Sequence, residues 1–359
     1  MKFLDNIKNS PDTRLDTIAE IVSSKLPVVI YGAGVNAVYT CRFLAKFDIT
    51  PFCFCDDDTT KTNFLDKPVY TYKQFRSLYP TLEAYIVIAI HQNNTSIYGK
   101  LCHNGEQKII RCLYPDDIFS DTPTDYQFIL ENENKFAELY SSLADDFSRQ
   151  TLYNLLNYKI TGKCIYLSDI YKPNTYFDPI TNLSGNEVFV DCGAFDGDSI
   201  IRFVKHVDGQ YKEIIGFEPD KSTFAKLMCN VSNFKNVSLY RNGVWNIACD
   251  MGFSETGLPC SVASPEAKTS IQMLTIDEMF AIKPITFLKV DVEGAEDKVL
   301  LGATNTIRRD KPKLAICVYH KKEDIFAIPN LIDSIRSDYK FYLRHHAYIS
   351  SDETVLYAM

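Results

Sequence analysis

Apolar runs of strand length alternate with stretches of helical periodicity along much of the chain, and twice a strand leads into a glycine turn. The first such strand covers residues 27–31 and is followed by Gly32 and Gly34, after which a helical pattern continues to Leu44. Further apolar runs of strand length lie at 51–56, 85–90 and 108–113. Because parallel strands need helical crossovers between them, this order predicts a small parallel sheet within residues 1–118.

Helical spacing dominates the middle of the chain. Phe136, Leu139 and Leu143 recur on one helical face. We therefore expect residues 119–184 to form a helical linker. The last part of this linker, residues 171–179, is rich in proline and aromatic residues and is expected to cover the second domain as a lid.

A second strand, glycine turn and helix begin near residue 187, where a strand ends on Asp191. Further strands are expected at 212–218, 237–241, 285–292, 313–319, 339–344 and 354–359. The last two are too close in sequence for a crossover helix, so we expect an antiparallel hairpin. The chain is thus predicted to be an α/β protein with two Rossmann-like domains joined by a helical linker, the second domain covering residues 185–359. This order of elements is that of a class I methyltransferase fold.

Composition and charge limit the partners of this fold. The chain has 359 residues, enough for two domains, and 46% of them are hydrophobic. The formal net charge of −8 argues against duplex nucleic acid or a membrane surface, because both are polyanionic. The first 11 residues do not resemble a signal peptide, and the 11 cysteines include no CxxC pair. We expect a cytoplasmic protein without a nucleic-acid or membrane partner; a homo-oligomer stays open.

The first glycine turn has residues that suit a nucleotide. Gly32 and Gly34 would let the backbone approach a phosphate at the start of the next helix. Asp56 lies 24 positions after Gly32, near the spacing of the ribose-binding acid in dinucleotide-binding folds. The same glycines also allow a helix to pack tightly on a strand. Two alternatives follow: a site for a nucleotide or nucleotide-sugar at Gly32, Gly34 and Asp56, or a purely structural turn.

The second glycine turn suits a different ligand. Asp191, Gly193, Ala194 and Gly197 follow the first strand of the second domain, in the pattern DxGAxxG. In an open α/β sheet a ligand lies across such strand ends. The turn has little side-chain bulk, so the amino-acid end of S-adenosylmethionine could pass there.

The next two strand ends extend this site. Glu218, in the run FEPD, can accept hydrogen bonds from both ribose hydroxyls of S-adenosylmethionine. Asn242 and Gly243 follow the third strand, where they can edge the adenine. The sequence therefore predicts a cofactor site across the ends of three neighbouring strands.

A group of polar residues follows the later strands. Asp291 and Glu293 alternate after the fourth strand, so they share one face at the carboxyl edge of the sheet. Methyl transfer to a hydroxyl benefits from a base, and the candidates are Asp291, Glu293 and His320. His345 and His346 lie at another strand end and are alternatives. Carboxylates and imidazole also bind divalent cations, but we assign no metal here.

Several of these segments resemble one family. Over residues 150–359 the chain resembles the FkbM family of methyltransferases, in the runs VDCGAFDGDS, GFEPD, TIDEM, FLKVDVEGAE, KPKLAICVYHK and YKFYLRHH. The resemblance implies a class I fold, S-adenosylmethionine as cofactor, and usually O-methylation of a sugar or polyketide-like hydroxyl. It implies cofactor contacts at Asp191, Gly193, Glu218 and Asp291. The run NGVWN at residues 242–246 departs from the family's small alanine-containing turn.

The first 118 residues are more loosely similar to small nucleotide-binding domains found beside sugar-modifying enzymes. Taken together, we expect an S-adenosylmethionine-dependent O-methyltransferase acting on a hydroxyl of a sugar, glycan or related small molecule. The alternative is an NAD- or nucleotide-sugar-binding protein, an oxidoreductase or a sensor, whose methyltransferase domain is degenerate. The absence of a Tyr-x-x-x-Lys set beside Gly32 argues against the oxidoreductase, and the intact acidic strand ends argue against degeneracy.

Overall fold

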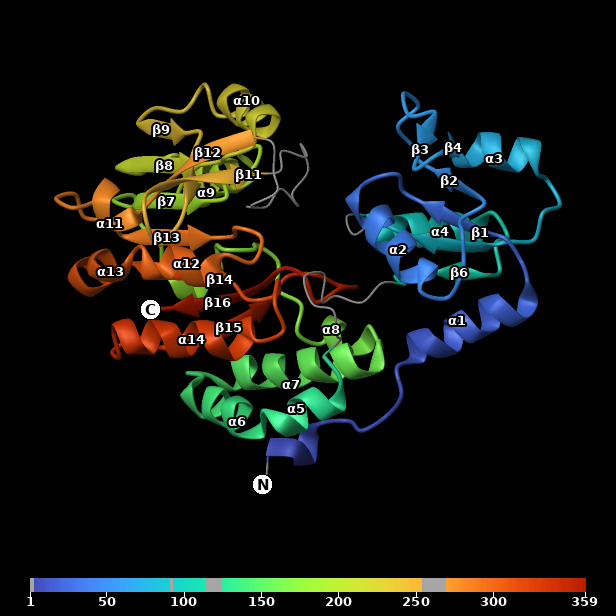
Figure 1. Ribbon diagram of the computed structural model, residues 1–359, viewed down its shortest axis with the longest axis horizontal. Helices are drawn as coiled ribbons and strands as arrows, with labels where there is room; N and C mark the ends of the chain where they lie inside the picture. Colours follow the sequence, from blue (N-terminus) through green and yellow to red (C-terminus); the bar gives the residue numbers. More distant parts are fainter. Residues whose placement is uncertain (1–2, 91–92, 114–123, 254–268) are drawn as a thin grey trace.

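The computed structural model describes residues 3–90, 93–113, 124–253 and 269–359. Two α/β units lie side by side, one from the start of the chain and one from its C-terminal half (Figure 1). The domain boundary predicted at residues 118–119 lies outside the described residues. Within the described ranges, every helix is too short or too polar to cross a membrane.

The first unit is a six-stranded sheet with helices on both faces. Its strands are β1 (Val28–Tyr31), β2 (Cys53–Cys55), β3 (Asn63–Phe64), β4 (Lys67–Tyr70), β5 (Tyr85–Ile88) and β6 (Ile109–Ile110). They lie in the order β3-β4-β2-β1-β5-β6, and all except β3 run parallel. The helices are α1 (Thr13–Ser24), α2 (Val35–Ala45), α3 (Tyr72–Leu78) and α4 (Asn94–His103). Because α1 and α2 cover one face and α3 and α4 the other, the central strands are fully buried.

The hydrophobic pattern did not predict β3 and β4. Both lie at one edge of the first sheet, and Val69 is the buried residue of β4. A short edge strand needs no continuous apolar run, so the sequence carries little signal for it.

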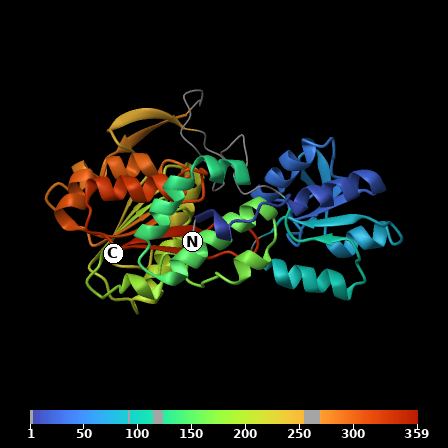
Figure 2. The same ribbon diagram turned by 90° about the horizontal axis from the view of Figure 1, so that it is seen from below.

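The helices of the middle segment cover the second unit. They are α5 (Tyr126–Glu131), α6 (Glu133–Ser142), α7 (Asp146–Thr161) and α8 (Ile165–Ser168). The short helix η1 (Phe3–Asn6), from the start of the chain, packs with them. Phe3 and Ile7 share a core with Leu139 of α6, Leu152 of α7 and Leu343 of the second unit. Figure 2, seen from below, shows these helices lying across that unit. The first residues of the chain therefore pack with the second unit and not with the unit of residues 1–118 in which the sequence placed them.

The second unit is built on a seven-stranded sheet. Its strands are β7 (Val188–Cys192), β8 (Glu213–Phe217), β9 (Val237–Tyr240), β13 (Phe287–Val290), β14 (Lys313–Cys317), β15 (Phe341–His345) and β16 (Thr354–Ala358). They lie in the order β15-β16-β14-β13-β7-β8-β9. The five strands from β14 to β9 run parallel, and β16 pairs antiparallel with both β14 and β15. The helices of this unit are η2 (Pro179–Thr181), α9 (Asp198–His206), α10 (Lys221–Asn230), α11 (Ile276–Met279), α12 (Glu296–Leu301), α13 (Thr304–Asp310) and α14 (Asp324–Ile335).

The order of strands reverses between β7 and β13. From β7 the chain continues outward to β8 and β9, whereas β13 leads in the opposite direction to β14. In an open α/β sheet this reversal leaves a crevice at the carboxyl ends of the strands, where ligands bind.

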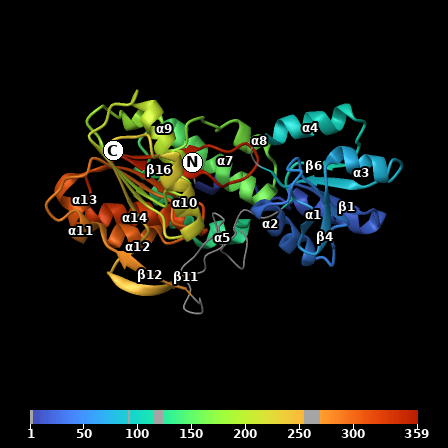
Figure 3. The same cartoon turned by 90° about the horizontal axis from the view of Figure 1, so that it is seen from above.

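A small second sheet stands beside the main one (Figures 2 and 3). Its strands are β10 (Gly243–Val244), β11 (Cys249–Phe253) and β12 (Thr269–Leu274), in the order β10-β12-β11. This sheet was not predicted from the sequence. In β12, buried Ile271 and Met273 alternate with exposed Ser270 and Gln272, which is the signal that would have predicted the strand.

Candidate active site

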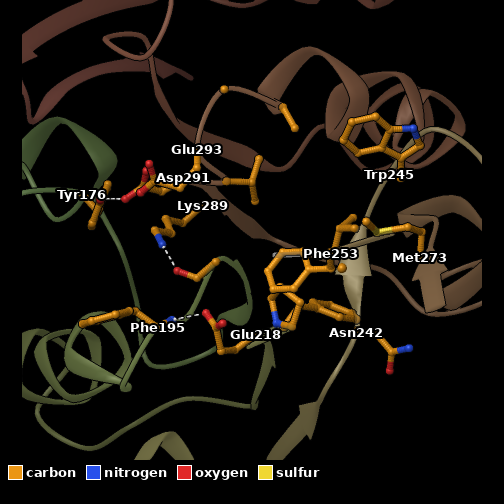
Figure 4. A pocket seen from close by; sticks show the side chains of 18 of the residues that line it. Tyr176, Phe195, Glu218, Asn242, Trp245, Phe253, Met273, Lys289, Asp291 and Glu293 are labelled. Carbon is orange, nitrogen blue, oxygen red and sulfur yellow. Dashed lines mark hydrogen bonds between the residues drawn. The ribbon is translucent and has the colours of Figure 1, made fainter. Parts of the chain in front are cut away.

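A cavity of about 440 Å³ opens at the carboxyl ends of β7, β8 and β13, where the strand order reverses. Its volume is in the range of small-molecule sites. Figure 4 shows Tyr176 and Asp291 on one side of the cavity and Phe253 and Met273 on the other. The cavity thus has a polar end and an apolar wall.

The glycine turn after β7 brings two strand ends into contact. Gly193 lines the cavity with a φ of +83°, and a Cβ there would lie 1.8 Å from the carbonyl oxygen of Asp291. Only glycine allows this approach. Gly197 packs against Val231, and Ala194 is fully buried. Of the three predicted turn residues, Gly193 faces the cavity, while Ala194 and Gly197 shape the turn.

Asp191 lies behind the cavity wall. Its carboxylate is fully buried, accepts a hydrogen bond from the Ser199 hydroxyl, and lies 2.9 Å from Lys289 Nζ. The same ammonium donates a 2.6 Å hydrogen bond to the carbonyl oxygen of Gly193. Burial alone would lower the pKa of Lys289, but the Asp191 charge outweighs it and the pKa is raised. The predicted direct contact of Asp191 with a cofactor is therefore corrected: Asp191 fixes Lys289, which in turn holds the glycine turn.

Glu218 is oriented by the backbone at the end of β8. Its Oε2 accepts a hydrogen bond from the Phe195 amide at 3.1 Å, and its Oε1 accepts one from the Asp220 amide at 2.8 Å. Burial raises the pKa of Glu218 to about 7, against these amides, which favour the ionised form. The carboxyl lines the cavity and has lone pairs left for hydroxyl donors.

The small sheet supplies the apolar wall. Gly243 lines the cavity, and a Cβ there would come within 2.3 Å of Met273 Sδ. Asn242 also lines the cavity, but its Nδ2 donates a 3.1 Å hydrogen bond to the carbonyl oxygen of Gln272. Phe253 and Met273 add apolar side chains to this wall of the cavity. The predicted adenine contacts of Asn242 and Gly243 are thus within reach of the cavity.

Asp291 is a fixed anion at the polar end. Its Oδ2 accepts a 2.7 Å hydrogen bond from the Tyr176 hydroxyl, and its Oδ1 accepts one of 3.3 Å from Tyr319. Burial would raise the pKa of Asp291, but the charges of Lys289 and His320 outweigh it and the pKa is lowered. A carboxylate held in this way is a poor proton acceptor, although the sequence made it a candidate base.

His320 lies behind Asp291 and Glu293 with 2% of its surface exposed. Its Nδ1 is 2.9 Å from Glu296 Oε1, and its Nε2 is 3.5 Å from Asp291 Oδ1 and 3.7 Å from Glu293 Oε2. Burial would lower the pKa of His320, but Glu296, Glu293 and Asp291 raise it to about 10. The imidazole is therefore charged at neutral pH, and the prediction of His320 as a base is corrected.

Glu293 remains as the predicted candidate with suitable proton affinity. It lines the cavity in a left-handed backbone conformation, with a φ of +57°. Burial raises the pKa of Glu293 to about 8, although the charge of His320 opposes the shift. A general base works best when its pKa lies near the working pH.

The carboxylates around His320 also have the chemistry of metal ligands. Asp291, Glu296 and His320 each offer one ligand atom within 4.8 Å of the others. Glu296 was not among the site residues predicted from the sequence. The imidazolium already supplies a positive charge to this cluster, so we read it as an ion-pair network.

His345 and His346 hold strands together and do not face the cavity. Nδ1 of His345 is 3.0 Å from Thr354 Oγ1, and His346 bridges the carbonyl oxygen of Lys172 (2.8 Å) and the Tyr357 hydroxyl (3.0 Å). Burial lowers the pKa of His345 to about 3 and that of His346 to about 4. Both rings are neutral at pH 7, and their role as alternative bases is corrected.

Several residues that line the cavity were not predicted from the sequence, among them Tyr176 and Glu353. Tyr176 lies in the loop expected to form a lid, and Glu353 lies in the turn before β16. Both have positive φ, +70° and +61°. The aromatic loop gave a signal for Tyr176. No signal marked Glu353, because tertiary pairing alone brings it to the cavity.

The glycines of the first turn are explained by packing. Gly32 has a φ of +115°, and a Cβ there would lie 2.9 Å from the carbonyl oxygen of Ala89. Gly34 precedes α2 and has open space around it. Close contact of the turn with the β5 end therefore accounts for Gly32 without a ligand.

Asp56 is engaged inside this turn. Its Oδ2 accepts a 2.8 Å hydrogen bond from the Ala33 amide and lies 2.9 Å from Lys61 Nζ, which also donates to the carbonyl oxygen of Ala33. Burial would raise the pKa of Asp56, but the Asp58 amide, Lys61 and the Ala33 amide lower it. A ribose at Asp56 would have to displace Lys61, so the geometry favours the structural alternative.

Comparison with known proteins places a methyltransferase domain in the second unit. Residues 191–349 match the family described as the Methyltransferase FkbM domain. The solved structure of methyltransferase FkbM from Methylobacillus flagellatus is similar over 97% of this chain and 94% of its own, with 22% identity and a TM-score of 0.69. That similarity shows a shared fold.

Other solved structures match more weakly. An rRNA methylase from Streptococcus thermophilus matches over 55% of this chain and 95% of its own, with 14% identity and a TM-score of 0.34. Fibrillarin from Aeropyrum pernix, in complex with S-adenosyl-L-methionine, matches over 49% and 69%, with 12% identity and a TM-score of 0.32. No curated protein matches this chain. The cavity therefore lies in an α/β unit whose residues 191–349 match the FkbM methyltransferase domain.

Proposed function

We propose that this chain is an S-adenosylmethionine-dependent methyltransferase that methylates a hydroxyl of a sugar, glycan or related small molecule. The proposal rests on the position of Glu218. Its buried carboxyl is held by two backbone amides and lines the cavity at the point where the strand order reverses. A ribose offers two adjacent hydroxyl donors, and such a carboxyl can accept both. The FkbM-domain match supports the same class of reaction.

The rest of the cavity fits the same cofactor. The turn at Gly193 has no side chain, which leaves room for an amino-acid end. Phe253 and Met273 offer an apolar surface to an adenine. When bound, S-adenosylmethionine supplies an electrophilic methyl group on a sulfonium.

The residues of the polar end would place and deprotonate the acceptor. Asp291 is a fixed anion that Tyr176 and Tyr319 hold in place, so it can orient a hydroxyl. Glu293 has a pKa raised to about 8 and can take the proton as the new bond forms. Alignment of the reacting groups supplies most of the remaining rate acceleration. An end lined with carboxylates and tyrosine hydroxyls supports a hydroxylated acceptor.

The test is isothermal titration of the full chain with S-adenosylhomocysteine and, separately, with NAD. We expect S-adenosylhomocysteine to bind, and Glu218→Gln to weaken it by roughly 10- to 100-fold, since a hydrogen bond to a charged group is worth about 1.5 to 3 kcal/mol. Glu213→Gln is the matched control, because Glu213 lies at the opposite end of β8 and pairs with Lys283. Binding of NAD in place of S-adenosylhomocysteine would contradict the proposal.

A further inference from the structure

The polar end of the cavity holds more carboxyl groups than cations. The ionisable acids and basic residues that line the cavity are Asp198, Arg202, Glu218, Lys289, Asp291, Glu293 and Glu353. Lys289 is already paired with Asp191 behind the wall, and Arg202 with Asp198 at 2.7 Å. The charge of His320 is shared among Asp291, Glu293 and the buried Glu296. The cations of this region are therefore committed, while Glu353 adds a further carboxyl.

Glu353 is held in the cavity by two segments that pair across the fold. The Lys172 amide donates a 2.8 Å hydrogen bond to the carbonyl oxygen of His345, and the carbonyl oxygen of Lys172 contacts the His346 ring. The His346 amide in turn donates to the carbonyl oxygen of Glu353. These contacts fix the turn of Glu353 beside the loop that carries Tyr176. A strained left-handed conformation that is fixed so firmly is typical of functional sites.

The Glu353 carboxyl has no hydrogen-bond donor within the described ranges. Burial, and then the charge of Asp291, raise the pKa of Glu353 to about 7, while Arg202 opposes the shift. The pKa of the Glu293 carboxyl is raised in the same way. A bound cation or protonation would therefore stabilise these two carboxyls at the polar end of the cavity.

We propose that Asp291, Glu293 and Glu353 make this cavity selective for a positively charged ligand, so that it binds S-adenosylmethionine more tightly than the demethylated product. The inference rests on the proposed function. S-adenosylmethionine carries a sulfonium that S-adenosylhomocysteine lacks, and the two molecules otherwise share their charges. One added charge beside partly buried carboxylates is worth a large change in affinity.

The same carboxyls can accept the proton that the reaction releases. The acceptor oxygen forms a bond to the methyl carbon, and the carbon–sulfur bond breaks with its electron pair on sulfur. The proton of the acceptor hydroxyl moves to a carboxylate of the polar end. The positive charge that leaves the sulfonium is thus replaced in the cavity by a proton, and the neutral nucleoside is free to leave.

An ammonium group on the acceptor would meet the same carboxylates, so the test uses nucleosides alone. The groups that face Glu293 and Glu353 from the surrounding elements are Tyr176, Asp198, Arg202, Lys289, Asp291, Glu296, Tyr319, His320 and Asp352. The pKa of Glu293 is about 8 and that of Glu353 is about 7, so both carboxyls change charge between pH 6 and 8. Glu218 titrates in the same window, but it faces the ribose that both nucleosides share, so the affinity ratio cancels its effect.

The experiment is isothermal titration of the full chain with S-adenosylmethionine, S-adenosylhomocysteine and sinefungin, whose amine keeps a positive charge in place of the sulfonium. At pH 8 we expect both cations to bind at least about tenfold more tightly than S-adenosylhomocysteine. At pH 6, where Glu293 and Glu353 are protonated and Asp291 stays ionised, the ratio should fall to within about threefold. Glu353→Gln should lower the ratio at pH 8, whereas Glu323→Gln, at an exposed position before α14, should not.

Thermal unfolding shows whether the Glu353→Gln protein is folded. If it is not, the affinity ratios of the wild-type chain at pH 8 and pH 6 still test the proposed charge selectivity. Equal affinity for S-adenosylmethionine and S-adenosylhomocysteine at both pH values would overturn the charge selectivity and leave the proposed function intact. Failure of all three nucleosides to bind would overturn both proposals.

Discussion

The two sheets place an acidic residue beside a glycine turn in the same way, Asp56 beside Gly32 and Glu218 beside Gly193. In the first sheet, Asp56 is bound by the Ala33 amide and by the ammonium of Lys61. In the second, Glu218 is held by backbone amides alone and faces a cavity. The carboxylate of the first unit is thus bound within its own turn, whereas the carboxylate of the second unit is available to a ligand.

The position of the nearest cation makes this difference. Lys61 sits directly on Asp56, so the acid is used inside the turn. Lys289 sits behind the cavity wall on Asp191, where it supports the Gly193 turn and leaves Glu218 for a ligand. A glycine turn and an acid therefore do not identify a nucleotide site until the partner of the acid is known.

The largest contrast is expected from removing each of the two lysines. Lys289→Met should lower the unfolding free energy by about 3 to 5 kcal/mol, because it leaves the buried Asp191 without a counter-charge. Lys61→Met should cost less than about 1 kcal/mol, since the Lys61 side chain is 36% exposed. Urea denaturation measures both losses of unfolding free energy, each in the unfolding transition of the unit that carries the substitution. Equal losses would mean that the two ion pairs are equivalent.

The glycines give the next contrast. Gly193→Ala would place a Cβ against the carbonyl oxygen of Asp291, so it should cost more than about 2 kcal/mol and abolish binding of S-adenosylhomocysteine. Gly34→Ala meets open space at an extended helix N-cap and should cost less than about 1 kcal/mol. Thermal unfolding and titration of both variants check this. A Gly193→Ala protein that binds normally would show that the turn is not part of the site.

The smallest of these effects concerns pH. The pKa of Glu218 is raised from 4.5 to about 7, so the ionised form that accepts ribose hydrogen bonds is lost as the pH falls through 7. Affinity for S-adenosylhomocysteine should therefore fall roughly tenfold between pH 8 and pH 6. Glu218→Gln should flatten this profile. Asp56→Asn should leave it unchanged, because the pKa of Asp56 is lowered and its charge is constant over this range; a change with Asp56→Asn would move the site to the first sheet.

The sequence predicted the parts of the fold whose pattern is local. β1 and β7 are continuous buried runs that end in glycine turns, so both their position and their neighbours could be read directly. The edge strand β3, its neighbour β4 and the small sheet of β10 to β12 are short or half exposed, and they were missed. The helices of residues 126–168 were expected, but their packing on the second unit depends on distant contacts.

The candidate site divides in the same way. Gly193 and Glu218 were predicted, because a backbone turn and a strand end have a local signature. Asp191 and His320 were predicted in the site, but the structure buries both side chains in ion pairs behind the cavity wall, which the sequence alone does not reveal. Glu353 was not predicted, because it reaches the cavity through pairing with a segment far away in the sequence.

A crystal structure of the full chain with S-adenosylhomocysteine tests the central claim most directly. We expect the ribose hydroxyls on the Glu218 carboxylate and the adenine against Phe253, with the amino-acid end beside Gly193. A nucleoside bound instead at the turn of Gly32 and Asp56 would contradict it.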